Sequence, residues 1–266
     1  MCEVLNVSRS GYYAFLKRPE SNRQKANREL LKKIKEIHEK SHKIYGYPRI
    51  TQNLPKDLKA SKNRVYRLMR ENGIASKTRR KYKATTNSKH NLPVAENILN
   101  QDFTAERPNQ KWVSDITYIE TGEGWLYLAG VMDLYGRPIV GWSMAEHMRT
   151  ELVENALKHA IGRTNAKAGL LVHSDRGVQY ASNKYQNLLK KSGFICSMSR
   201  KGNCYDNAPM ESFWGKLKTE WLYGQKFKTR AEAKRAVFEY IEIFYNRQRT
   251  HTTNRYVAPC HYGKVA

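Results

Sequence analysis

The 266-residue sequence has no apolar run long enough to cross a membrane. A transmembrane helix needs about 20 consecutive apolar residues, and no segment supplies them. The first residues also lack the apolar stretch of a secretory signal peptide. We therefore expect a cytoplasmic protein without a membrane partner.

Cysteine is scarce and scattered, without a CxxC pair, so we expect reduced thiols and no zinc site. His38 and His42 have an H-x3-H spacing, but no CxxC follows within about 40 residues. We expect both to be exposed helix residues. The cysteines are Cys2, Cys196, Cys204 and Cys260.

Acidic residues are few, since 24 Asp and Glu face 48 Lys and Arg, which gives a net charge of +24. The excess is uneven. Residues 1–92 hold 24 basic and 7 acidic residues (+17), and residues 93–266 hold 24 and 17 (+7). With a pI near 9.9, this distribution favours a nucleic-acid partner for the front third.

Three amphipathic helices are expected in the first domain, residues 1–92. Residues 28–40 repeat apolar side chains at helical spacing, and the sequence YGYPRI (45–50) turns into a second helix. A third begins after Ser61 as N-cap and stops at Gly73. This order predicts a small all-α helix-turn-helix region.

The third helix is strongly basic, and a recognition helix that enters a major groove has this character. The run KTRRKYK (77–83) continues the charge into a linker that ends near Leu92. A solvated basic face on a small bundle is the alternative. The expected DNA-binding residues of this region are Lys62, Arg64, Arg67, Arg70, Arg79 and Arg80.

The second domain, residues 93–266, changes to alternating, β-branched segments followed by helices. The order βββαβαβα indicates an α/β fold with a mixed sheet flanked by helices. Thr150 and Thr229 are the expected N-caps of two helices. The expected strands are 111–120, two within 125–144, 170–175 and 194–197, and the expected helices are 151–163, 182–192, one from 207–209 and 230–247.

Three acids stand out by position. Asp115 lies inside the first strand, Asp175 closes the fourth, and Glu211 heads a helix. Taken singly, each acid is explained by an ion pair in so basic a protein. Together, carboxylates on neighbouring strands and a covering helix can hold two divalent cations ~3.5–4 Å apart, and such hard oxygen ligands favour Mg²⁺ or Mn²⁺.

Four motifs carry a resemblance: WVSDITYI, VMDLYGRPIVGWSM, LVHSDRGVQYAS and KGNCYDNAPMESFWGKLKTE. They resemble the catalytic core of the insertion-sequence transposases of the IS-three family, a branch of the retroviral-integrase-like DDE superfamily. The resemblance requires the 35 residues that separate Asp175 from Glu211. It implies an RNase H-like core in which Asp115, Asp175 and Glu211 support DNA nicking at element ends and strand transfer by the 3′-hydroxyl.

Lys218 follows Glu211 by seven residues. In a helix the two side chains therefore point in directions that differ by ~20° around the axis, and they lie ~10.5 Å apart along it. The resemblance implies that Lys218 contacts DNA beside the scissile phosphate. Asp206 is the local competitor of Glu211, and we expect it to act as an N-cap alongside Asn207. We expect Asp133 to be structural, and His173 to lie near the metals without being a ligand.

Both ends of the chain extend the resemblance. VSRSGYYAFLKRP and YGYPRITQNL resemble the start of the family's second reading frame (OrfB), and YNRQRTH with Pro259 resembles its closing signature. One departure is Asn254-Arg255, where the family usually has Leu-Gly. The family implies a bacterial, nucleoid-associated enzyme that binds terminal repeats and target DNA. It also implies a frameshift fusion with the upstream-frame product and a homo-oligomer on DNA.

Two other functions fit the same composition. A catalytically inactive DNA-binding regulator would keep the basic front end, but the intact acid trio argues against it. A ribonuclease of the same core fold would keep the acids, but the helix-turn-helix front end argues against it.

Overall fold

The computed structural model describes residues 2–77, 94–200 and 203–263 and divides the chain into two compact units, Met1–Lys77 and Thr78–Ala266. The boundary expected between residues 92 and 93 lies outside the described residues, as do Arg79 and Arg80. No helix among the described residues is long and apolar enough to span a membrane. Each unit is described by itself.

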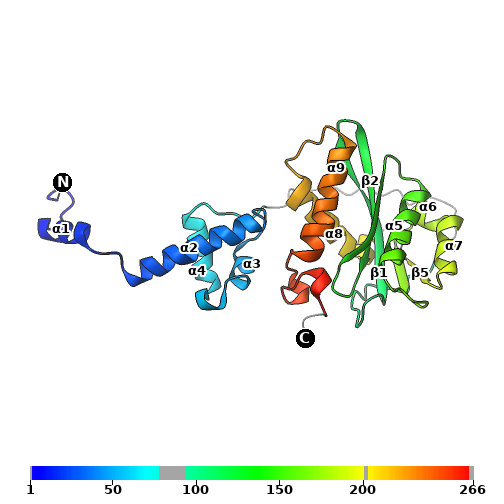
Figure 1. Ribbon diagram of the computed structural model, residues 1–266, viewed down its shortest axis with the longest axis horizontal. Coiled ribbons are helices and arrows are strands. Elements are labelled where there is room, and N and C mark those ends of the chain that lie inside the picture. The colour runs from blue at the N-terminus through cyan, green and yellow to red at the C-terminus, as the bar shows by residue number, and fades with distance from the viewer. Residues whose placement is uncertain (1, 78–93, 201–202, 264–266) are drawn as a thin grey trace. The chain divides into compact units, whose positions relative to one another are not determined.

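The first unit is helical throughout (Figure 1). The helix expected at residues 28–40 begins earlier, at Asn22, because Ser21 and Gln24 form a capping box that satisfies two backbone N–H groups. Ser61 accepts from the Arg64 backbone N–H as expected, and Gly73 has φ +64° just after the third expected helix. The helices are α1 (Arg9–Lys17), α2 (Asn22–Lys40), α3 (Tyr47–Gln52) and α4 (Lys62–Glu71).

Helices α2, α3 and α4 share one apolar core. Leu30, Ile34 and His38 recur every four residues along α2 and are all buried, so they line one helix face. The prediction that His38 and His42 are exposed helix residues was wrong for His38, whose side chain is buried. For His42 the exposure was predicted correctly, but the place on a helix was not. His38 Nε2 lies 3.2 Å from the Ala75 carbonyl oxygen, and His42 lies beyond the end of α2 with φ +54°.

The second unit has the expected α/β order. The two strands within 125–144 are separate and joined through residues 134–138. The strands are β1 (Lys111–Thr121), β2 (Gly124–Asp133), β3 (Ile139–Ala145), β4 (Leu171–Ser174) and β5 (Ile195–Met198). The helices are α5 (Thr150–Arg163), α6 (Val178–Ala181), α7 (Asn183–Lys191), α8 (Ala208–Leu217) and α9 (Arg230–Phe238).

The five strands form one mixed sheet in the order β3-β2-β1-β4-β5. Strand β1 pairs antiparallel with β2 and parallel with β4, and β4 pairs parallel with β5. Helices α5, α6 and α7 cover one face, and α8 and α9 cover the other (Figure 1). This is the mixed sheet flanked by helices that the sequence predicts.

Two helix boundaries test the capping predictions. Thr229 accepts from the Glu232 backbone N–H and starts α9, as predicted, and helical structure continues through a π-helical segment, Glu239–Tyr245, to residue 247. The prediction for Thr150 was wrong. The N-cap of α5 is Arg149, which makes no side-chain cap hydrogen bond, because Thr150 already belongs to the helix.

Candidate active site

Asp115 and Asp175 lie on adjacent parallel strands. The register pairs Val113 of β1 with His173 of β4, so two further residues along each strand bring Asp115 level with Asp175, directly after the end of β4. Both side chains are half-buried. A backbone N–H donates to one oxygen of each carboxylate, from Ile116 at 2.8 Å and from Gly177 at 2.9 Å.

Glu211 is exposed in the first turn of α8, the helix that packs against β1. The helix starts at Ala208, with Pro209 at its second position, where a missing N–H does no harm. The sequence placed this helix start correctly.

Asp175 and Glu211 each lie within electrostatic range of Asp115. Burial raises the pKa of Asp115 to about 8, and the negative charges of Asp175 and, to a smaller extent, Glu211 add to this effect. Hydrogen bonds from Ile116 and Trp214 act in the opposite direction. Three carboxylates, two of which raise the pKa of the third, form a centre of negative potential that a divalent cation would relieve.

The donor set fits Mg²⁺ or Mn²⁺, which prefer carboxylate oxygens. The described parts of the chain gather no group of three or more His, Cys, Asp or Glu side chains closely enough to hold a metal ion. Glu211, whose side chain is exposed, is the member that comes from a helix and not from the sheet.

Two side chains hold α8 against β1: Trp214, which the sequence analysis did not single out, and Asn207, which it named only as an N-cap. Trp214 donates its indole N–H to Asp115 Oδ2 at 3.1 Å. Asn207, which precedes α8, donates its side-chain amide to the Ser114 carbonyl oxygen at 2.9 Å. Neither contact could be found by spacing alone, because each joins residues more than 90 positions apart.

Lys218 lies within electrostatic range of Asp115, on the π-helical segment Lys218–Leu222, which continues α8. Its ammonium nitrogen sits 4.8 Å from the centre of the Tyr118 ring, and the side chain is half-buried. Burial lowers the pKa of Lys218, and its interactions with Tyr118 and Asp115 oppose this. A cation therefore adjoins the carboxylate group.

Asp206 is not the N-cap that we expected. Its buried carboxylate pairs with the Arg200 guanidinium at 2.8 Å, which holds the pKa of Asp206 well below its usual range. It also accepts from the side-chain amides of Asn97 at 3.0 Å and Gln101 at 2.9 Å. These contacts fasten the segment before α8 and occupy both carboxylate oxygens.

The structure gives Asp133 and His173 structural contacts. Asp133 is buried and accepts from the backbone N–H groups of Asn109 at 2.8 Å and Tyr135 at 3.0 Å, while burial raises its pKa to about 6. The two ring nitrogens of His173 lie 2.9 Å from the Ser197 hydroxyl and 3.1 Å from the Ser199 hydroxyl. Both nitrogens are thus engaged within the protein.

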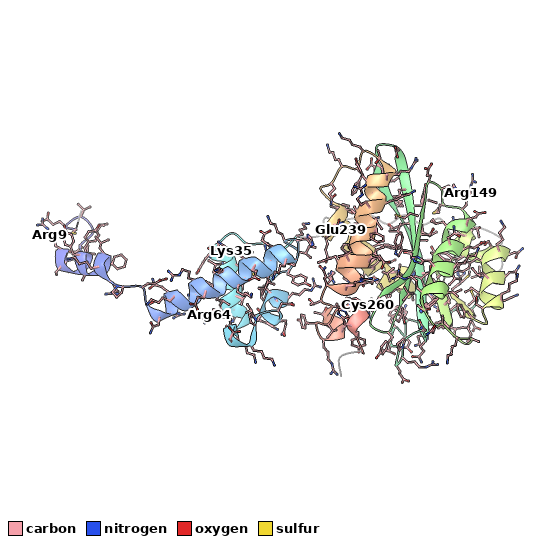
Figure 2. All side chains as sticks on the ribbon, viewed as in Figure 1. Arg9, Lys35, Arg64, Arg149, Glu239 and Cys260 are labelled. Carbon is pink, nitrogen blue, oxygen red and sulfur yellow. The ribbon has the colours of Figure 1, made fainter. Side chains whose placement is uncertain are left out.

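The basic residues of α4 divide into two groups. Lys62, Arg67 and Arg70 are exposed. Arg64, which Figure 2 labels on α4, instead donates from Nε to Asn27 Oδ1 of α2 at 2.9 Å. Part of the Arg64 guanidinium is therefore used to join α4 to α2.

Two residues absent from the sequence predictions, Asn63 and Tyr66, also lie on the exposed side of α4. At 100° per residue they share an arc of about 100° with Arg67 and Arg70, opposite the buried stripe. The Tyr66 ring lies 5.3 Å from that of Tyr47 on α3, edge to face, and both remain exposed. The stripe on the opposite side consists of Val65, Leu68 and Met69.

Family comparisons agree with both units. Residues 25–82 match the family described as "HTH-like domain", and residues 105–204 and 211–265 match two families described as "Integrase core domain". The chain is 48% identical over 260 residues to the "Insertion element IS600 uncharacterized 31 kDa protein" of Shigella sonnei, covering 97% of this chain and 96% of that protein. It is 43% identical over 259 residues to the "Transposase InsF for insertion sequence IS3A" of Escherichia coli (strain K12), covering 95% and 88%.

A solved structure shares the fold at low identity. It is that of the simian T-cell lymphotropic virus intasome in complex with PP2A regulatory subunit B56 gamma, with a TM-score of 0.51 and 16% identity. The likeness covers 85% of this chain and 73% of that chain.

Proposed function

The chain belongs to the family of insertion-sequence transposases that includes the InsF proteins, and from this premise we propose how its residues carry out DNA transposition. Asp115, Asp175 and Glu211 are the catalytic acids of a polynucleotidyl transferase. The observation that carries the proposal is their electrostatic grouping at the junction of β1, β4 and α8.

Two substitutions at phosphorus make up the proposed reaction. First, the oxygen of a water bonds to phosphorus at the element end, and the P–O3′ bond breaks to leave a 3′-hydroxyl. Then this hydroxyl oxygen bonds to a second phosphorus, whose own P–O3′ bond breaks. No covalent link to the enzyme forms.

The three carboxylates would hold two Mg²⁺ or Mn²⁺ ions, which activate the attacking oxygen and stabilise the leaving one. The roles of the neighbouring residues follow from their positions. Lys218 supplies a positive charge next to the acids, where a DNA phosphate beside the cleaved bond would lie. Asp206, which is engaged by Arg200, keeps the segment before α8 in place.

DNA recognition belongs to the helix-turn-helix region. We assign α4 as the recognition helix, because its exposed side carries Asn63, Tyr66, Arg67 and Arg70 together. Asn63 and Tyr66 are suited to base edges, and the guanidinium groups to base edges or phosphates. Lys62 lies at the rim of this surface, where a phosphate contact fits. Arg79 and Arg80 extend the basic run in the sequence.

Two partners complete the proposal. The family resemblance favours a fusion with the upstream-frame product, and α1 leaves all its apolar side chains unburied among the described residues. Simultaneous handling of two element ends favours a homo-oligomer on DNA. The proposed fusion would be contradicted if this chain alone bound element ends with the same affinity and selectivity as the fusion protein. The proposed homo-oligomer would be contradicted if the active complex on DNA were monomeric.

A nicking and strand-joining assay tests the function. The full chain is incubated with DNA that carries the repeats flanking its gene and with Mg²⁺ or Mn²⁺. We expect Asp115→Asn and Glu211→Gln each to abolish both steps while DNA binding persists. Glu239→Gln, which changes an exposed glutamate elsewhere in the same unit, is the matched control.

The outcomes also separate the two alternative functions. Strand transfer at the wild-type level by Asp115→Asn would overturn the assignment of the acids. Tight binding without cutting, both by the chain alone and by its fusion with the upstream-frame product, would identify a DNA-binding regulator. Preferential cleavage of an RNA–DNA hybrid would identify a ribonuclease.

A further inference from the structure

The helix that carries Glu211 is attached to the strand that carries Asp115 by two side-chain donors. Asn207 donates to the carbonyl oxygen of Ser114, and Trp214 donates to the carboxylate of Asp115. Both donors come from the same segment as Glu211, Asn207 four residues before it and Trp214 three residues after it. The positions of the first and third acids are therefore coupled through direct contacts.

Gly130 makes the contact between Trp214 and Asp115 possible. It pairs with Asp115 across the β1–β2 ladder, and the Trp214 ring lies over it. A Cβ on residue 130 would lie 2.8 Å from Trp214 Cη2 and 3.2 Å from Met210 Cε. Any other side chain at position 130 would push the indole away from the strand.

The hydrogen bonds to Asp115 orient its carboxylate. Oδ1 accepts from the Ile116 backbone N–H at 2.8 Å, and Oδ2 accepts from the Trp214 indole N–H at 3.1 Å. Each oxygen thus has one fixed donor and retains a second lone pair. A carboxylate held in this way needs little rearrangement to accept a cation, which is the effect that outer hydrogen bonds have on metal ligands.

We propose that Trp214 is a positioning residue for the reaction. Its N–H sets the orientation of the Asp115 carboxylate for cation binding, and Gly130 provides the space in which the indole sits. This inference rests on the proposed function, because it takes Asp115 as a metal ligand. It assigns Trp214 a role beyond packing, since packing requires the ring but not the N–H.

The test uses Mn²⁺ alone as the probe and the full-length protein. Mn²⁺ affinity is measured by electron paramagnetic resonance, in parallel with strand transfer at a series of Mn²⁺ concentrations. Trp214→Phe keeps an aromatic ring and removes the donor. Trp142→Phe is the matched control, because the Trp142 indole N–H donates to a different carboxylate, that of Glu242, at 2.7 Å.

We expect Trp214→Phe to weaken Mn²⁺ binding roughly 10–100-fold and to raise the Mn²⁺ concentration needed for half-maximal activity by a similar factor. Gly130→Ala retains the Trp214 indole N–H but displaces the indole ring. It should weaken Mn²⁺ binding by the same factor as Trp214→Phe. Trp142→Phe should leave Mn²⁺ affinity unchanged. Urea unfolding without metal shows whether each variant is folded.

The failure modes are distinct. If Asp115→Asn abolishes Mn²⁺ binding while Trp214→Phe and folded Gly130→Ala bind like the wild type, the inference is wrong and the proposed function stands. If Asp115→Asn itself binds Mn²⁺ normally, the assignment of Asp115 as a ligand fails. A shift of the same size in Trp142→Phe would show that the effect comes from general loss of packing and would overturn the inference.

Discussion

Arg249 and Glu220 form an ion pair in the interior of the second unit. The Arg249 Nε lies 2.6 Å from Glu220 Oε2, a second bond joins Nη2 to Oε1, and only 1% and 9% of the two side chains are exposed. The Tyr240 hydroxyl donates to the same carboxylate at 2.8 Å. The pair connects the YNRQRTH segment to the helical region that carries Glu211 and Lys218.

Replacement of Arg249 by methionine should lower the free energy of unfolding of this unit by about 3–5 kcal/mol, because Glu220 would remain buried without its counter-charge. Urea denaturation at pH 7 measures the change. The control is Lys184→Met, which breaks an exposed pair with Glu151 and should change stability by less than about 1 kcal/mol. If Arg249→Met and Lys184→Met lowered the free energy of unfolding equally, the buried position of the Arg249–Glu220 pair would not increase its effect on stability.

His173 predicts an acid-sensitive contribution to stability. Burial lowers its pKa from 6.5 to about 4, and nearby Asp206 opposes this shift. Between these values the unfolded chain binds more protons than the folded protein, so stability falls as the pH falls. Between pH 7 and pH 5, protonation of His173 in the unfolded chain should lower the free energy of unfolding by about 2 kcal/mol. The His173→Gln variant should lack this part of the pH dependence. Urea denaturation at several pH values measures the free energy of unfolding of the wild type and of His173→Gln. The same pH dependence in both proteins would contradict this role of His173.

Arg255 occupies a left-handed backbone conformation, with φ 53° and ψ 39°. This is the position at which the family resemblance has glycine, which adopts positive φ without a steric penalty. Arg255→Gly should therefore raise stability by about 0.5–1 kcal/mol, since the relief of strain exceeds the extra entropy of the unfolded chain.

The control for this prediction is Arg235→Gly, an exposed site inside helix α9. That change should lower stability by about 1 kcal/mol. Thermal unfolding distinguishes the two variants by the sign of the shift in Tm. A fall in Tm for both would mean that the backbone of Arg255 is not strained.

The exposed side of α4 predicts two kinds of binding defect. Lys62→Ala should weaken binding to all DNA sequences alike and reduce the slope of log affinity against log salt by about 1. Tyr66→Ala should instead reduce the preference for element ends over unrelated DNA, by about 1–3 kcal/mol. Fluorescence anisotropy at several salt concentrations measures both quantities. Loss of affinity without loss of preference in Tyr66→Ala would remove Tyr66 from base recognition.

Features that depend on nearby residues were predictable from the sequence. The caps at Ser61 and Thr229 and the positive φ of Gly73 follow from interactions within about one helical turn. The order of strands and helices follows from the period of the apolar residues. Hydrophobic periodicity missed His38, which completes an apolar face although its side chain is polar.

The predicted acids show the limit of sequence reasoning at the candidate site. Their residue types and the 35-residue interval singled out Asp175 and Glu211, and the parallel pairing of β1 with β4 brings Asp115 beside Asp175. Their role as metal ligands stays a prediction.

By itself, then, the sequence determined the local elements, the basic front end and the family, because these depend on composition, short-range periodicity and motif spacing. Only the tertiary structure decided what surrounds each acid. Trp214 reaches Asp115 across 99 positions, and Arg200 rather than a helix end engages Asp206. Such contacts depend on strand register and on the space above Gly130, and packing between distant segments creates both.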